Sequence, residues 1–333
     1  MIIIPAENML AEFYRILINK GFTKENAQRS AEIFTNNSID GIYSHSVNRF
    51  ATFIKMVDEG FIKPNNIPSL KHKNAGVEQW DGNLGPGPLN ALYATDTAIN
   101  LSQQYGIGCV ALSNTNHWMR GGAYGWHAAK KGFVFIGWTN TIANMPAWGA
   151  IDNKLGNNPF VIAVPYKDEA IVLDMAMSQY SFGKMEMAEM KNEKLSVLGG
   201  YDASGILTND PTKIIQSKRP LPIGYWKGAG LSLLLDVLAT VLSGGSSTSE
   251  ISKRKIETAL SQVFIAIDIS HLNNYSSIPS LIENIINDYH SSVTEDEKTN
   301  IIYPGERVLK TRRHNLANGI PVIKTIWEEI RQL

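Results

Sequence analysis

The sequence predicts an α/β fold in which a mixed β-sheet is combined with a smaller helical unit. Two observations support this prediction. From about residue 89, short runs rich in valine, isoleucine and phenylalanine alternate with longer segments of helical spacing. At both ends of the chain the helical spacing occurs alone. We therefore expect residues 1–70 and 305–333 to form a helical domain, and residues 71–304 to form an α/β domain that carries most of the binding residues.

Three helices are predicted in the first 65 residues. Apolar side chains follow helical spacing from Met9 to Leu17, and Gly21 ends that run. Thr23 is a suitable N-cap for a second helix. A third helix is expected to begin near Ser44 and to end at Gly60.

Turn-forming residues fill positions 64–88, where we expect a loop. Beyond it, the pattern predicts helices at 89–105, 122–131, 228–243 and 278–290, and strands at 107–112, 133–139, 161–164, 170–175 and 263–269. Two more helices are expected at 307–318 and 321–332. The most apolar stretch, 231–242, is interrupted by Asp236 and is shorter than the roughly 20 residues of a membrane span, so we expect a buried helix.

Composition narrows the class of protein. The 333 residues carry 31 basic and 31 acidic side chains, a balance that argues against a surface for nucleic acid. Cys109 is the one cysteine, which excludes an intrachain disulfide and fits a reducing compartment. The N-terminus lacks the basic start and cleavage site of a signal peptide. We expect a cytoplasmic protein without membrane contact.

Several common motifs are absent or misleading. Residues 106–111, GIGCVA, match the spacing of a dinucleotide-binding loop, but they follow a predicted helix and open a strand, which is the reverse of the required order. A helix stop at Gly106 is the better interpretation. The sequence has no phosphate-binding P-loop, no serine-hydrolase elbow and no paired-histidine zinc motif, so we expect no metal.

The segment GIYSHSVNRF, residues 41–50, carries the most specific chemistry. If Ser44 caps a helix, His45 lies in the first turn and Arg49 shares its face. A guanidinium can bind a carboxylate through two parallel hydrogen bonds, and an imidazolium can donate a proton to a neighbouring carbonyl. Such a pair suits a 2-keto acid. The helix N-terminus and Arg49 would both lower the pKa of the imidazole, and no offsetting carboxylate is identifiable from the sequence.

An ordinary helix start with a surface histidine is the alternative for that segment. A second polar cluster, NTNHWMRGG at 114–122, follows a predicted strand, where ligand sites of α/β proteins tend to form. Asn116 and His117 are able to hydrogen-bond a polyhydroxy substrate, although a purely structural turn is equally compatible. Lys227 precedes an apolar helix whose N-terminus can hold phosphate.

Taken together, these segments resemble one family over nearly the whole chain: the malate/L-lactate dehydrogenase family that is unrelated to the Rossmann-type enzymes of the same names. The residues that carry the resemblance are GIYSHSVNRF (41–50), NHWMRGG (116–122), GWTN (137–140), DM (174–175) and GYWKG (224–228). Within the family, the similarity is strongest to the reductases of a diketo sugar acid.

The resemblance implies hydride transfer between NAD, with NADP as the other possibility, and a small 2-keto or 2-hydroxy acid. It implies an atypical, non-Rossmann nicotinamide site and a homodimer with the active site near the subunit interface. His45 would donate the proton and Arg49 would bind the substrate carboxylate, with Ser44, Asn116, His117 and Thr141 also at the substrate. The implied cofactor-binding residues are Ala170, Ile171, Val172, Leu173, Asp174, Met175, Ala176, Trp226, Lys227, Gly305, Glu306 and Arg307.

Other substrates of the family, namely malate, lactate, ureidoglycolate or a cyclic imino acid, remain alternatives, and a nucleotide-binding protein without catalysis is a more distant one. One position departs from the family pattern, because Ser46 stands where glycine usually follows the histidine. A glycine with positive φ would be hard to replace, whereas serine costs little inside a helix. We expect the helical case.

Overall fold

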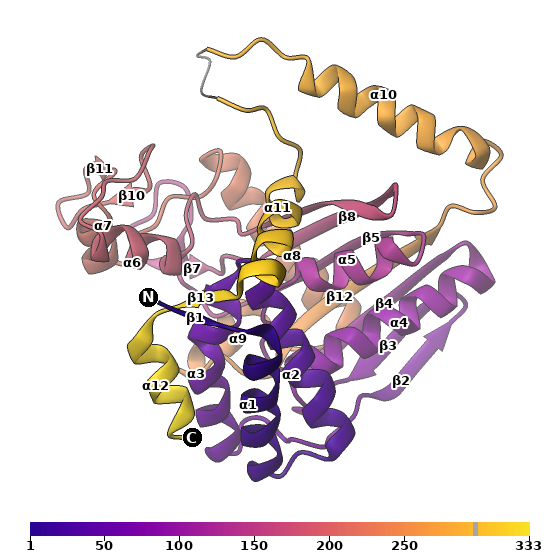
Figure 1. Cartoon of the computed structure of the whole chain (residues 1–333), viewed down its shortest axis with the longest axis horizontal. Coiled ribbons are helices and arrows are strands. Elements are labelled where there is room, and N and C mark those ends of the chain that lie inside the picture. The colour runs from indigo at the N-terminus through magenta and orange to yellow at the C-terminus, as the bar shows by residue number, and fades with distance from the viewer. Residues whose placement is uncertain (296–298) are drawn as a thin grey trace.

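A computed structural model, which describes residues 1–295 and 299–333, confirms the α/β fold (Figure 1). Within the described residues the main sheet has seven strands in the order β2-β3-β4-β12-β5-β8-β9. The pair β3-β4 is parallel and the other neighbours are antiparallel, so the sheet is mixed. The strands are β2 (Ser69–Asn74), β3 (Val77–Asp81), β4 (Ile107–Thr115), β5 (Phe133–Thr139), β8 (Phe160–Tyr166), β9 (Glu169–Met175) and β12 (Leu260–Asp268).

Helices cover both faces of this sheet. Successive residues of a strand point to opposite faces, and in β12 Phe264 packs in one buried cluster while Val263 packs in another. The cluster around Phe264 takes its helical residues mainly from α4 (Gly87–Tyr105) and α5 (Gly122–Lys130). The cluster around Val263 takes Ala229, Leu235 and Ala239 from α8 (Trp226–Ser243). The strands near the middle of the sheet are therefore buried on both sides.

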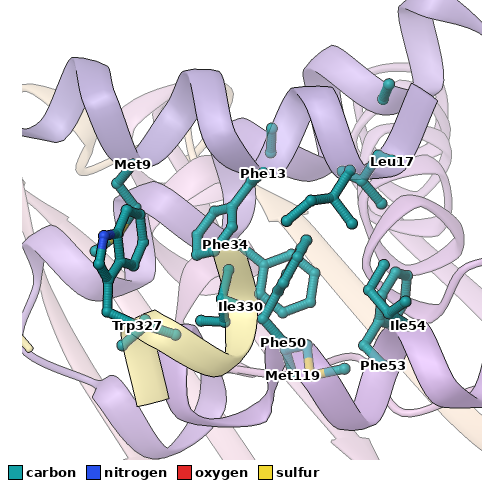
Figure 2. Packing of buried hydrophobic residues seen from close by; sticks show 14 of the residues in the cluster. Met9, Phe13, Leu17, Phe34, Phe50, Phe53, Ile54, Met119, Trp327 and Ile330 are labelled. Carbon is teal, nitrogen blue, oxygen red and sulfur yellow. The ribbon is translucent and has the colours of Figure 1, made fainter. Parts of the chain in front are cut away.

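The N- and C-terminal segments share a separate apolar core (Figure 2). The rings of Phe13 and Phe50 stack with centroids 4.1 Å apart, and Trp327 from the C-terminal segment meets Phe13 edge-on at 6.4 Å. Burial of such aromatic side chains is a major source of core stability. The contributing elements are β1 (Ile2–Ile4), α1 (Ala6–Asn19), α2 (Lys24–Ile39), α3 (Val47–Asp58), β13 (Ile320–Val322) and α12 (Lys324–Arg331), and α11 (Glu306–Asn318) connects them to the sheet domain. The domain boundaries at residues 70 and 305 stay a prediction.

The structure differs from the prediction at residues 64–88 and 321–332. Residues 64–88 were expected to be a loop, but they contain the β2-β3 hairpin, whose turn holds Ala75 at a φ of 48°. Strand β2 is exposed along its length, so it has no buried face to produce an alternating pattern. The predicted helix at 321–332 is also too long, because Ile320–Val322 pairs with Ile2–Ile4 as β13-β1 and the helix begins only at Lys324.

Residues 231–242 do lie in a helix, as predicted, but that helix is only partly buried. Helix α8 packs one side on the sheet, but its other side leaves Leu234 57% and Val241 67% exposed. Within the described residues, α8 is the one helix long and apolar enough to cross a membrane by length and composition, and a third of that window (33%) is buried. Its packing against β12 identifies it as a partly buried helix of the sheet domain.

The remaining elements surround the sheet. The predicted helix at 278–290 is confirmed as α10 (Ile278–His290), which stands away from the main body in Figure 1. Ion pairs from Lys167 to Glu283 and from His290 to Glu306 connect it to the rest of the chain. The sequence analysis did not predict several small elements that lie between β5 and α8 or after α8. They are β6 (Met145–Pro146), β7 (Asn153–Leu155), α6 (Phe182–Met190), β10 (Gly200–Tyr201), β11 (Leu207–Thr208), α7 (Pro211–Ser217) and α9 (Thr248–Lys253).

The loop between β4 and α5 joins the two apolar cores. Trp118 lies in the core of the sheet domain, and Met119 lies in the core of the helical unit. Arg120 is 4% exposed and forms an ion pair with Asp40, the C-cap of α2. Three consecutive residues thus fix the helical unit against the sheet, and His117 directly precedes them.

Candidate active site

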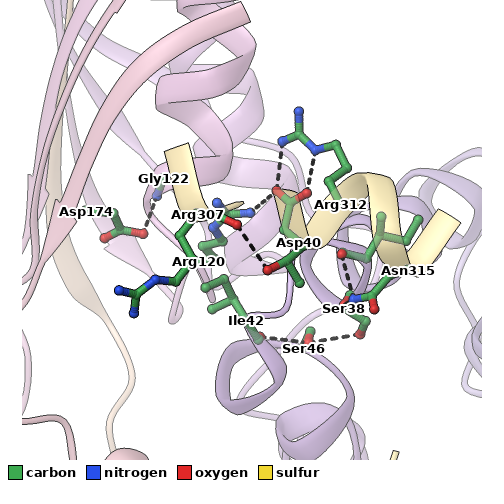
Figure 3. Close-up of polar contacts among 12 residues, drawn as sticks. Ser38, Asp40, Ile42, Ser46, Arg120, Gly122, Asp174, Arg307, Arg312 and Asn315 are labelled. Atoms are coloured by element: carbon green, nitrogen blue, oxygen red, sulfur yellow. Dashed lines mark hydrogen bonds and ion pairs between the residues drawn. The ribbon is translucent and has the colours of Figure 1, made fainter. Parts of the chain in front are cut away.

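The sequence predicted His45 in the first turn of a helix, but in the structure it lies just before that helix. A 3-10 turn spans Tyr43–His45, Ser46 is the N-cap, and α3 begins at Val47. Ser46 is neither helical nor in the positive-φ region, with a φ of −145° and a ψ of −111°. Its hydroxyl donates to the Ile42 carbonyl at 2.8 Å and bonds to the Ser38 hydroxyl at 2.9 Å (Figure 3). Serine at this position therefore anchors the turn that carries His45.

The imidazole of His45 faces His117, with ring centroids 5.8 Å apart and planes inclined by 22°. Its Nδ1 is 2.8 Å from the Ser44 hydroxyl, so this predicted substrate residue orients the imidazole. Among the described residues, Nε2 of His45 has no hydrogen-bond partner. That nitrogen is therefore available to exchange a proton with a bound molecule.

Arg49, His117 and Glu257 converge beside His45. The Glu257 Oε1 lies 3.6 Å from the Arg49 Nη2 and 3.9 Å from the His117 Nε2. His117 Nδ1 accepts the Met119 amide at 2.9 Å, so a neutral His117 carries its proton on Nε2. The side chains of Arg49 and Glu257 are 36% and 18% exposed, respectively. The group combines a cation, a carboxylate and two imidazoles at the junction of the helical unit with the sheet.

Burial and positive charge keep both histidines neutral in the free protein. Burial, the largest cause, together with Arg49 and Arg120 lowers the pKa of His45 to about 4. Burial also holds the pKa of His117 well below its usual range, with contributions from Arg49 and His45. An anion bound at Arg49 would oppose these effects and raise the proton affinity of His45.

Asn116 and Thr141, which the sequence placed at the substrate, are fully engaged with the protein. The Asn116 side chain is buried, donates to the carbonyls of Phe61, Leu84 and Gly85, and accepts from Thr258. These bonds give Asn116 a structural role, and the substrate contact expected of it stays a prediction. The Thr141 hydroxyl is likewise buried among protein oxygens, including the Asn157 and Asn158 side chains. The predicted catalytic residue His45 and the predicted substrate residues Ser44, Arg49 and His117 do come together.

A buried ionic network around Asp40 holds the elements that carry the site (Figure 3). Asp40 pairs with Arg120 and accepts two bonds from Arg312 of α11, at 2.6 and 2.9 Å. Arg312 also reaches Glu169 at the start of β9, at 3.3 Å. The network connects α2, the β4-α5 loop, α11 and β9. Breaking one partner of such a buried pair is costly, so the network holds these four elements in fixed relation.

Comparison with known proteins identifies the family. A family model described as malate/L-lactate dehydrogenase matches residues 4–331 of the chain. The chain belongs to this family. A 2,3-diketo-L-gulonate reductase of Escherichia coli O127:H6 is 41% identical over 328 residues, which are 98% of either protein.

Solved structures support the same assignment. The sulfolactate dehydrogenase of Methanocaldococcus jannaschii superposes with a TM-score of 0.91 at 26% identity, over 99% of this chain and 96% of that chain. The malate dehydrogenase of Entamoeba histolytica reaches 0.93 at 22% identity over 99% and 96%, which shows the common fold. The protein is accordingly a dehydrogenase of 2-hydroxy or 2-keto acids, and dehydrogenases of this family use NAD(P)H.

The predicted cofactor residues gather along the edge strand β9. Val172 of β9 donates its amide to the Pro304 carbonyl at 2.9 Å, which brings residues 305–307 beside the strand. Gly305 has a φ of 99°, and a Cβ there would lie 3.2 Å from the Val172 nitrogen. Beyond β9, Met177 accepts the Ile223 amide at 2.8 Å, so the segment leading to Trp226 and Lys227 approaches the same end of the strand.

The side chains of β9 alternate, as expected of a strand. Ala170 and Val172 point into the core and can meet a ligand only through their backbone. Ile171, Leu173, Met175 and the following Ala176 are half-buried, whereas Asp174 is exposed. The Asp174 carboxylate accepts the Gly122 amide at 2.8 Å, and the crowding of protein around it raises its pKa, an effect that Arg120 and the Gly122 amide oppose.

These residues fit a nicotinamide dinucleotide by the chemistry of their side chains. Asp174 retains acceptor capacity for a ribose hydroxyl. Arg307 and Lys227 have no ion-pair partner among the described residues, so both can contact phosphate. Figure 3 shows the Arg307 side chain leaving α11 on the side of Asp174. Trp226 is 65% exposed and offers an aromatic face. Glu306 Oε2 lies 3.0 Å from His290 Nε2 and accepts the Tyr303 amide, and its predicted contact with the cofactor stays a prediction.

Sequence reasoning missed two residues of the site. Glu257 precedes β12, more than two hundred residues after Arg49, and no local pattern marks it. Arg120 was quoted within the 114–122 cluster but received no role, although it is buried and acts on the pKa of both His45 and Asp174. A buried arginine needs a carboxylate partner, so the only available signal was an arginine between apolar residues and glycines.

Proposed function

We propose that this dehydrogenase reduces 2,3-diketo-L-gulonate at C2 to 3-dehydro-L-gulonate, with NADH as the hydride donor and NADPH as the alternative. The observation that carries the chemistry is the convergence of His45 and Arg49, with Arg120 close enough to both His45 and Asp174 of β9 to affect their pKa values. The substrate is supported by relatives named 2,3-diketo-L-gulonate reductase that are 40% and 41% identical over 98% of the chain.

In this proposal, each residue has a defined task. Arg49 binds the C1 carboxylate, for which a guanidinium offers two parallel donors. That carboxylate offsets the positive charge beside His45, so the imidazole is able to bind a proton and to transfer it from Nε2 to the C2 oxygen. The cofactor supplies the hydride to C2. Ser44 holds the His45 ring in place through Nδ1.

Another 2-keto acid, such as oxaloacetate or pyruvate, or a cyclic imino acid or ureidoglycolate, is the main alternative. The same His45 and Arg49 roles apply to each of these substrates. A nucleotide-binding protein without catalysis is the second alternative, and the free Nε2 of His45 argues against it.

A spectrophotometric assay of NADH and NADPH oxidation with a panel of these substrates tests the proposal. We expect a kcat/KM for 2,3-diketo-L-gulonate more than about tenfold above that of the other keto acids. The variant His45→Asn should fold and bind NADH but lose at least about a hundredfold in kcat. Turnover close to that of the unmodified protein would remove His45 from the mechanism. Preference for another keto acid would keep the mechanism and change the substrate.

We also propose that the chain is a cytoplasmic homodimer. Helix α8 leaves Leu234, Val237 and Val241 exposed on one apolar face, and an exposed apolar patch of this kind marks an interaction surface. Light scattering coupled to size-exclusion chromatography should give twice the chain mass, and Leu234→Glu should reduce it to one chain mass. A monomeric unmodified protein at micromolar concentration would contradict the proposal.

A further inference from the structure

Glu257 is a carboxylate without a firm partner in the centre of the site. Its Oε2 accepts the Ile142 amide at 3.3 Å. Its Oε1 lies 3.6 Å from Arg49 and 3.9 Å from His117, and both separations are too long for hydrogen bonds. The side chain is 18% exposed, and Oε1 lies near both basic side chains. An acceptor with open capacity is therefore next to the residue proposed to bind the substrate carboxylate.

The backbone around Glu257 is held in an unusual conformation. Lys255 and Ala259 flank it two residues away on either side, with φ values of 59° and 54°. Positive φ is costly for residues other than glycine and tends to persist at functional sites. The Thr258 hydroxyl donates to the buried Asn116 side chain at 2.9 Å, which fixes the turn against the residue that precedes His117. The backbone that carries Glu257 is thus fixed by the fold.

We propose that Glu257 is a specificity-determining residue, which accepts a hydrogen bond from a hydroxyl group of the substrate and repels a second carboxylate. The inference rests on the proposed function, because it takes Arg49 as the anchor of the substrate's first carboxylate. It selects a class of substrate: keto acids whose chain carries hydroxyl groups are favoured, and dicarboxylic keto acids are rejected.

The charge of the surroundings agrees with this role. Burial raises the pKa of the Glu257 carboxyl, while Arg49 and the Ile142 amide favour its charged form. Arg49 alone cannot neutralise two carboxylates, so a dicarboxylate would bring a third negative charge next to one guanidinium. A substrate hydroxyl, in contrast, can donate to Oε1, which accepts no hydrogen bond from the described residues.

The test compares three substrates in the full-length protein: 2,3-diketo-L-gulonate, oxaloacetate and pyruvate, which has neither hydroxyls nor a second carboxylate. Glu257→Gln keeps the shape of the side chain and removes its charge. Glu25→Gln is the matched control, since Glu25 is 78% exposed on α2 and lies outside the site. Circular dichroism and thermal melting establish that each variant is folded.

We expect Glu257→Gln to lower kcat/KM for 2,3-diketo-L-gulonate by about tenfold and to raise it for oxaloacetate, with pyruvate changed by less than about threefold. Glu257→Asp, which retains the charge, should stay closer to the unmodified protein and serves as the test if the glutamine variant does not fold. An equal loss for all three substrates, or no change in their ratio, would show that Glu257 is only structural. If the unmodified protein prefers oxaloacetate, both this inference and the proposed substrate fall. If it prefers 2,3-diketo-L-gulonate but the ratio of kcat/KM between the substrates is the same in Glu257→Gln, only this inference is refuted.

Discussion

The variant His45→Gln should lose less unfolding free energy in mild acid than the unmodified protein. The pKa of His45 is lowered from 6.5 to about 4 in the folded state, chiefly by burial. Below pH 6.5 the unfolded chain therefore binds a proton at this residue that the folded chain does not bind. Stability must fall as the pH drops from 6.5 towards 4, and the effect is complete below pH 4.

The magnitude follows from these two pKa values. At pH 5 the proton-binding difference corresponds to a factor of about 30 in the unfolding equilibrium, or about 2 kcal/mol, whereas at pH 7 it is about 0.2 kcal/mol. Between pH 7 and pH 5, the unmodified protein should thus lose about 2 kcal/mol more unfolding free energy than His45→Gln. Titrating groups that His45 does not affect act equally on both proteins and cancel in the difference.

Urea unfolding followed by tryptophan fluorescence at pH 7 and pH 5 measures the effect. His72→Gln is the control, because His72 lies on the exposed strand β2 and should show the same acid loss as the unmodified protein. If His45→Gln and the unmodified protein lose the same free energy within about 0.5 kcal/mol, His45 is not held neutral in the free protein. The argument that substrate binding charges this residue would then be refuted.

Three other changes have definite expected outcomes. Arg49→Lys should raise KM for the keto acid by about tenfold with a smaller change in kcat, since lysine lacks the paired donors; steady-state kinetics with an unchanged KM would oppose a carboxylate contact. Asp40→Asn should lower the free energy of unfolding by about 3–5 kcal/mol, because it leaves the buried Arg120 without its carboxylate and leaves Arg312 with Glu169 alone; a loss below about 1 kcal/mol in urea unfolding would show that the network is dispensable. Gly305→Ala should destabilise by about 1–3 kcal/mol, because alanine is strained at a φ of 99°, and should weaken NADH binding in a fluorescence titration; NADH affinity equal to that of the unmodified protein would separate Gly305 from the cofactor.

Local sequence patterns were sufficient wherever an element has one clearly buried face or a strong stop signal. The strand at 133–139 and the helix at 278–290 were predicted with the bounds that the structure gives, Phe133–Thr139 and Ile278–His290. Gly106 ends α4 in a left-handed conformation, as the helix-stop interpretation requires. Where an element depends on distant pairing, as in β1-β13 or the exposed strand β2, the sequence carried no periodic signal and the prediction was wrong.

The candidate site divides in the same way. The sequence alone determined which reactive side chains are present and that His45 and Arg49 are close, because four residues of chain cannot separate them far. It could not determine that the Asn116 side chain forms hydrogen bonds with backbone carbonyls, or that Glu257 lies near both Arg49 and His117. It also could not show that α8 leaves an apolar face uncovered. These features are set by contacts between segments far apart in the chain, and such contacts depend on how whole elements pack and not on the spacing of residues within any one of them.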